Sequence, residues 1–85
     1  MDKQEILAVI KRHIEEVIPG IDLGRITLET SLRDLGANSI DRADILIMTM
    51  ERLRLKFPLT ELAGAKNLQG LVDCFARKLA GPDSG

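Results

Sequence analysis

The side chains in this sequence that first suggest covalent or acid–base chemistry are His13, Ser39 and Cys74. A serine becomes a nucleophile only when a base accepts its proton, and the single histidine stands far from Ser39, in the first predicted helix. The turn that presents the nucleophile of serine hydrolases is also missing, because Ala37 and Asp41 stand where that turn needs glycine. These residues therefore argue against an enzyme.

His13 and Cys74 are each the only residue of their type, so the chain can form neither an internal disulfide nor a zinc cluster. We expect His13 to lie on the surface of its helix. We expect Cys74 to be a small buried apolar side chain in the last helix. No catalytic residue and no metal site is expected.

Ser39 stands where a long helical pattern begins, directly after the turn expected at Leu35 and Gly36. The backbone N–H groups and the dipole at the start of a helix favour a negatively charged group at this position. The plain alternative is that Asn38 or Ser39 only caps the helix. Position alone leaves both interpretations open.

The composition limits the classes of function. The 85 residues are 45% hydrophobic and 29% charged, which is typical of one folded domain, and 12 basic residues face 13 acidic ones. A nucleic-acid-binding module would carry a basic excess, and a membrane span would need about 20 apolar residues in succession. We therefore expect a cytoplasmic, monomeric protein that binds no nucleic acid and no membrane.

Helical periodicity predicts an all-α fold, an up-down bundle of three main helices plus one short helix. The predicted helical segments are 2–17, 38–55, 60–65 and 67–79. Three of them begin at side chains that can cap backbone N–H groups: Asp2, with Glu5 three residues later, Asn38 and Asn67. We assign 1–80 to one domain and 81–85 to a flexible tail.

A long loop, 18–38, is predicted between the first and second helices. Its large aliphatic residues are Ile21, Leu23, Ile26, Leu28, Leu32 and Leu35. A solvated linker would not hold so many, so we expect these side chains to turn inward. Ser31 and Asp34 can cap one short turn within the loop.

The predicted second helix carries more apolar side chains than two neighbouring helices can cover. One arc of its helical wheel holds Ile40, Ala43, Leu46, Ile47, Met50 and Leu53, while Ile45 and Met48 fall outside it. Leu46 and Leu53 should face the bundle. These surplus apolar side chains indicate either deeper burial of the helix or an exposed face that docks partner proteins. Residues 34–51 include four acids and one base, and this acidic excess favours the docking face. The predicted docking residues are Asp34, Asp41, Ala43, Asp44, Ile47, Met50 and Glu51.

The run Asp34-Leu35-Gly36-Ala37-Asn38-Ser39-Ile40-Asp41 resembles the attachment motif of acyl carrier proteins, in which an aspartate usually precedes the modified serine and a leucine follows it. The order of predicted helices is similar over nearly the whole chain. The resemblance implies that a phosphopantetheinyl transferase links 4′-phosphopantetheine from coenzyme A to Ser39, and that the thiol carries acyl groups as thioesters. Asn38 and Ile40 depart from the family pattern: Asn38 removes one charge from the partner surface, and Ile40 keeps an apolar anchor that is β-branched.

Residues 36–45 and 61–68 resemble freestanding donor carriers of polyketide β-branching cassettes. The implied partners, besides the transferase, are an acyltransferase, a decarboxylating ketosynthase-like enzyme that converts carried malonyl to acetyl, and a hydroxymethylglutaryl (HMG)-type synthase that adds this acetyl to a β-ketone. Acceptor carriers there tend to bear a tryptophan after the serine, and this chain has none. The alternatives are a general fatty-acid or polyketide carrier, a peptidyl carrier and, from another class, a helical adaptor without a prosthetic group.

Overall fold

The computed structural model describes residues 2–80, so the predicted tail 81–85 lies outside the described residues. Three α-helices and three short 3-10 helices follow one another as α1 (Lys3–Val17), η1 (Leu23–Arg25), η2 (Arg33–Leu35), α2 (Ser39–Leu53), η3 (Leu59–Leu62) and α3 (Leu68–Ala80). Within residues 2–80 there is no strand, and the predicted all-α bundle is confirmed. None of these helices is long and apolar enough to cross a membrane.

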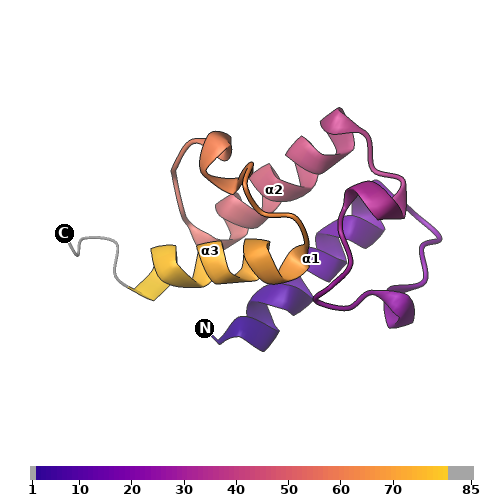
Figure 1. Cartoon of the computed structure of the whole chain (residues 1–85), viewed down its shortest axis with the longest axis horizontal. Helices are drawn as coiled ribbons and strands as arrows, with labels where there is room; N and C mark the ends of the chain where they lie inside the picture. Colours follow the sequence, from indigo (N-terminus) through magenta and orange to yellow (C-terminus); the bar gives the residue numbers. More distant parts are fainter. Residues whose placement is uncertain (1, 81–85) are drawn as a thin grey trace.

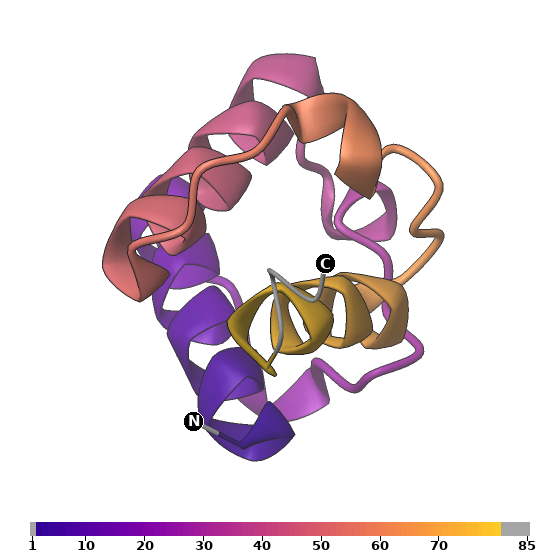
Figure 2. The same ribbon diagram turned by 90° about the vertical axis from the view of Figure 1, so that its left-hand side faces the viewer.

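α1 packs against both of the other long helices (Figure 1). The short η3 contacts α2 on one side and α3 on the other. The segment that contains η3 arches from the end of α2 over to the start of α3 (Figure 2). The start of α2 is therefore flanked by two irregular segments, the long loop before it and the η3 segment.

The first and last helices begin where the sequence predicts. The backbone N–H of Glu5 donates to Asp2 Oδ1 at 2.8 Å, and the N–H of Asp2 donates to Glu5 Oε1 at 3.0 Å, which forms the predicted capping box of α1. At α3 the N–H of Gly70 donates to Asn67 Oδ1 at 3.0 Å. Local side-chain hydrogen bonds thus define both starts.

The short helix and the end of α2 differ slightly from the prediction. α2 ends at Leu53 rather than near Leu55, because Arg54 adopts a left-handed backbone with φ 59° and directs its N–H back to the last turn. The short helix spans Leu59–Leu62 rather than 60–65. Pro58, directly before this helix, has an extended backbone. The helical turn therefore begins at the next residue, Leu59.

The long loop is held against the helices through both its side chains and its backbone. Ile26 and Leu32 are buried, as predicted, whereas Leu28 remains 36% exposed. The N–H groups of Leu68 and Gln69 donate to the carbonyl oxygens of Thr30 and Leu28, each at 2.8 Å. These bonds satisfy backbone donors at the start of α3, which have no partner inside the helix, and so join the loop to α3.

A second local feature of the loop is also confirmed. The N–H of Asp34 donates to Ser31 Oγ at 3.0 Å, so the two residues predicted to meet at this turn are hydrogen-bonded at η2, whose first flanking residue is Leu32. Gly36 then takes a left-handed backbone with φ 89°, a conformation that costs glycine little, and turns the chain into α2. The loop therefore delivers Ser39 to the start of a long helix in a defined direction.

The core-facing side of α2 differs from the predicted arc. Ile45, predicted to fall outside the arc, is fully buried, whereas Ile40 is 71% exposed. Leu53 is buried and Leu46 packs against the core, as predicted. The helical wheel gives the angles between the side chains of one helix, but it does not show on which side the neighbouring helix packs. Here α1 packs over the side of α2 that contains Ile45, Thr49 and Leu53.

The predicted surface position of His13 is wrong. Its side chain is buried, and Nδ1 lies 2.8 Å from Thr49 Oγ1 across the α1–α2 contact. A buried polar ring is tolerated when a hydrogen bond satisfies it, and the periodicity of one helix gives no indication of such a partner. The predicted burial of Cys74 is confirmed.

Candidate functional site

Ser39 is the first residue of α2, and its side chain is exposed. The neighbouring residue caps the helix: Asn38 Oδ1 accepts a hydrogen bond from the N–H of Asp41 at 2.8 Å, and the N–H of Asn38 donates to Asp41 Oδ2 at 3.4 Å. Because this capping box does not use the serine, the Ser39 hydroxyl is not needed to hold the helix. Of the two residues expected as caps, the structure assigns the cap to Asn38 and not to Ser39.

Two kinds of hydrogen-bond donor lie beside the Ser39 hydroxyl. The guanidinium of Arg42 donates from Nη1 to the carbonyl oxygen of Ala37 at 3.0 Å, and its Nη2 lies 3.5 Å from Ser39 Oγ. The backbone N–H groups of Ser39 and Ile40 are in the first turn and have no hydrogen-bond partner within residues 2–80. A phosphate ester at Ser39 would meet these N–H groups and the Arg42 cation, so the residues fit such a group.

The other chemistry-bearing side chains lie elsewhere. His13 is bonded to Thr49, in the second half of α2, and Cys74 is buried in α3. In the part of the chain that the structure describes, no group of three or more His, Cys, Asp or Glu side chains could hold a metal ion. The site thus presents a hydroxyl and donors for an anion.

Four side chains form a line along the solvent-facing side of α2, opposite Ile45 and Thr49; we call Ile40, Asp44, Ile47 and Glu51 the outer stripe. All four are exposed, Ile40 by 71% and Ile47 by 40%. Sequence reasoning included three of them among the docking residues but omitted Ile40. The position of Ile40 in the first turn, directly after Ser39, could have indicated that its side chain is exposed, because that turn extends beyond the core.

The remaining predicted docking residues do not join this line. Asp34 is exposed but lies in η2, before the serine. Asp41 is half-buried and its carboxylate is used in the capping box. Ala43 and Met50 are half-buried, and Met50 packs against the core. The structure therefore gathers part of the predicted set, around two exposed isoleucines and two acids.

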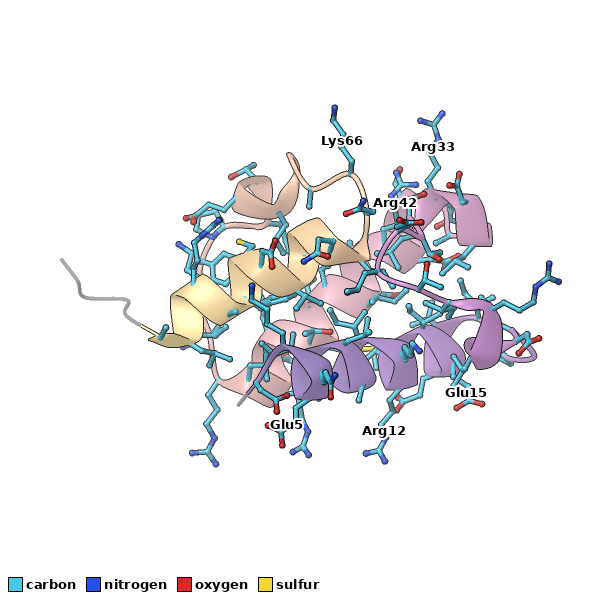
Figure 3. The ribbon with its side chains drawn as sticks, turned by 60° about the horizontal axis from the view of Figure 1, so that its bottom comes forward. Glu5, Arg12, Glu15, Arg33, Arg42 and Lys66 are labelled. Atoms are coloured by element: carbon cyan, nitrogen blue, oxygen red, sulfur yellow. The ribbon has the colours of Figure 1, made fainter. Side chains whose placement is uncertain are left out.

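A cavity of about 670 Å³ adjoins the site, between η2, the first half of α2, the η3 segment and the start of α3. Three cations line it: Arg33, Arg42 and Lys66. Arg33 and Lys66 extend outward on either side of Arg42 (Figure 3). Sequence reasoning named neither Arg33 nor Lys66, because they stand far apart in the chain and only the fold brings them together.

Comparison with known proteins gives one family match and relatives that span the chain. Residues 8–75 match the family described as "Phosphopantetheine attachment site". The polyketide biosynthesis acyl-carrier-protein AcpK of Bacillus subtilis (strain 168) is 44% identical over 79 residues, which is 93% of this chain and 96% of that protein. An acyl carrier protein of Guillardia theta is 30% identical over 81 residues, 94% of this chain and 99% of that protein.

A solved structure is similar in fold and in sequence. It is the crystal structure of the curacin biosynthetic pathway HMG synthase in complex with acetyl donor-ACP. The matching chain superposes with a TM-score of 0.85 and is 42% identical, and the match covers 92% of this chain and 100% of that one.

Proposed function

The chain belongs to the acyl carrier protein family, and from that premise we propose that Ser39 is the residue to which 4′-phosphopantetheine is attached. The observation that carries the proposal is the exposed Ser39 hydroxyl at the first turn of α2. It lies beside N–H groups that have no hydrogen-bond partner among residues 2–80, and 3.5 Å from Arg42 Nη2. The capping of α2 by Asn38 supports it, because modification of Ser39 would leave the helix start intact.

The roles of this chain are presentation and electrostatic support rather than catalysis. Ser39 presents its hydroxyl to the transferase, which supplies the base, since His13 is bonded to Thr49. Arg42 and the first-turn N–H groups would hold the phosphodiester and offset its negative charge. When bound, the prosthetic group supplies a thiol on which acyl groups are carried as thioesters.

Within the family, we propose a donor carrier for polyketide β-branching, with malonyl and then acetyl as cargo. The support is the structural match to a chain of the HMG synthase complex with acetyl donor-ACP, together with the 44% identity to a polyketide carrier and the absence of tryptophan. The proposed partners are the transferase, an acyltransferase, a decarboxylating ketosynthase-like enzyme and an HMG-type synthase, met by a monomeric carrier in the cytoplasm.

The outer stripe of α2 is the proposed docking surface for these enzymes. Ile40 and Ile47 are the exposed apolar anchors, and Asp44 and Glu51 lie between and beyond them on the same face. A few apolar anchors give a docking surface its energy, while acids around them direct the approach of a basic partner. Such a small surface suits a carrier that must leave each partner quickly.

The test of attachment is intact-mass spectrometry after incubation with a phosphopantetheinyl transferase and coenzyme A. The wild-type chain should gain the mass of one phosphopantetheine, and Ser39→Ala should gain none. Ser31→Ala, which removes another serine hydroxyl near η2, should be modified like the wild type. A wild-type chain that gains no mass would favour the helical adaptor, and modification of Ser39→Ala would contradict the assigned residue.

A second assay separates the donor carrier from the general carrier. Acetyl-loaded protein is presented to an HMG-type synthase with an acceptor carrying a β-ketone, and in parallel to a fatty-acid ketosynthase. A donor carrier should deliver acetyl to the synthase much faster than an unrelated acyl carrier does. Equal rates for the two carriers would favour the general carrier.

A further inference from the structure

A shallow groove lies between α1 and the last turn of α2, away from the proposed attachment site. Its volume is about 300 Å³, and its lining includes His13 and Arg12 from α1 and Arg52 from α2. Neither Ser39 nor any residue of the outer stripe lines it. The groove is therefore separate from the surfaces that the proposed function uses.

The imidazole of His13 forms part of this groove, and its hydrogen bond determines the role of its second nitrogen. The Thr49 hydroxyl donates to the carbonyl oxygen of Ile45 at 2.8 Å, so it must accept from His13 Nδ1, also at 2.8 Å. The proton of the neutral ring is therefore on Nδ1. Nε2 is left as a hydrogen-bond acceptor.

Nε2 reaches the groove although the His13 side chain is only 7% exposed. No fully buried side-chain nitrogen or oxygen among residues 2–80 lacks a hydrogen-bond partner. Nε2 has no partner in that part of the chain, so it must touch solvent, and the groove that His13 lines is where it does so. An acceptor in this position is satisfied only by a group that brings a proton.

Two cations stand at the rims of the groove, one on each helix. Arg12 and Arg52 are exposed, and neither forms an ion pair with a carboxylate of the described residues. Arg12 extends from α1 toward solvent on the same side as Glu5 (Figure 3). Glu5 also lines the groove but is engaged in the capping box of α1, and no residue of α3 contributes to the lining. The rims thus offer guanidinium donors on either side of an acceptor.

We propose that this groove binds a phosphate group that keeps one P–OH, either as inorganic hydrogen phosphate or as a phosphomonoester. The P–OH would donate to His13 Nε2, and the other oxygens would accept charge-assisted hydrogen bonds from Arg12 and Arg52. A carboxylate or a phosphodiester has no proton to donate and would leave Nε2 without a partner. The pattern of donors and acceptor therefore selects one class of anion.

The two sources of such a phosphate differ in their pH dependence. Burial lowers the pKa of His13 from 6.5; Glu16 opposes this, and Arg12 and Arg52 lower it further, so the free ring is neutral near pH 7. Inorganic phosphate still has a P–OH at about pH 8, whereas a phosphomonoester, with a second pKa of about 6, has lost its proton there. Above about pH 7 the monoester must therefore bind with a proton from solution, and its affinity should fall by up to tenfold for each pH unit. The affinity for inorganic phosphate should change much less.

The test titrates the unmodified chain with phosphate and with sulfate, two tetrahedral anions of similar size, at constant ionic strength. Sulfate carries no proton near neutral pH, so phosphate should bind about fivefold more tightly, the scale of one hydrogen bond. ¹⁵N NMR should show a shift of the His13 Nε2 signal with phosphate and little shift with sulfate. Glycerol 3-phosphate, titrated at several pH values, distinguishes a monoester from the free ion.

Matched variants locate the site. Arg52→Gln removes one rim cation and should weaken phosphate binding by about threefold or more, the scale of one exposed charge pair. Arg77→Gln also removes an exposed arginine from the last turn of a long helix, but one outside the lining, and should leave binding unchanged. Equal affinities for phosphate and sulfate, or an equal loss in the two variants, would overturn the proposal. Because the chain is unmodified, none of these results depends on attachment at Ser39.

Discussion

His13 Nδ1 lies 2.8 Å from Thr49 Oγ1, a hydrogen bond that joins α1 to α2 inside the core. The Thr49 hydroxyl donates its own proton to the carbonyl oxygen of Ile45 at 2.8 Å. The hydroxyl must therefore accept the bond from His13, which places the ring proton on Nδ1. This pair is a buried polar contact between the two helices.

Removal of the acceptor should destabilise the fold without touching the site. Thr49→Val leaves the buried His13 N–H without a partner, so we expect the free energy of unfolding to fall by about 1–3 kcal/mol. Thr60→Val, at an exposed position, should change it by less than about 0.5 kcal/mol. Urea unfolding of both variants measures the difference, and equal values would show that the hydrogen bond contributes nothing.

The same histidine gives the stability a pH dependence. Burial lowers the pKa of His13 from 6.5; Glu16 opposes this, and Arg12 and Arg52 lower it further. The unfolded chain therefore takes up a proton near pH 6.5 while the folded protein does not, so stability falls as the pH drops below about 6.5. His13→Gln, whose amide can still donate to Thr49, should show a flatter dependence in urea unfolding between about pH 7 and pH 5.

The carboxyl of Asp73 contributes to the pH dependence of stability in a different pH range from His13. Hydrogen bonds from Lys3 and Gln69 lower the pKa of its carboxyl from 3.8, so its contribution is lost only in more acidic solution. A stability loss in His13→Gln that matches the wild type between about pH 7 and pH 5 would show that another group is responsible.

Two neighbouring isoleucines of α2 should have opposite roles. Ile45→Ala empties part of the core and should cost about 2–5 kcal/mol of stability, because Ile45 is fully buried. Ile47→Ala, on the outer stripe, should leave the melting temperature nearly unchanged while it slows acetyl delivery to an HMG-type synthase. Thermal unfolding and the transfer assay measure the two effects. If Ile47→Ala proves as destabilising as Ile45→Ala, the outer stripe is part of the core and not a docking surface.

The acids of the outer stripe should act on the rate of association. Asp44→Lys or Glu51→Lys should slow encounter with a basic partner, and the defect should shrink as salt rises, because salt screens charges at the edge of an interface. Glu15→Lys, an exposed reversal on α1, makes the same change in net charge away from the stripe and serves as the control. Stopped-flow association at several salt concentrations decides the question, and a defect independent of salt would indicate a packing role instead.

The sequence by itself determined the three long helices, where each of them starts, and the motif around Ser39. Asp2, Asn38 and Asn67 each accept a hydrogen bond from an N–H three residues later, so these caps depend only on nearby residues. The position of Ser39 after Gly36 and before a helical pattern is equally local. Such features persist whichever way the helices later pack.

The tertiary structure alone decided which side of each helix is buried and which distant residues meet. His13 and Thr49 are 36 residues apart, and His13, expected on the surface of its own helix, is buried because the fold places Thr49 beside it. Ile45 is buried and Ile40 exposed because α1 covers one side of α2 and not the other. The cations of Arg33 and Lys66 share a cavity only because the loop and the η3 segment both return to the start of α2. Periodicity fixes angles within one helix, whereas burial depends on what the rest of the chain places against it.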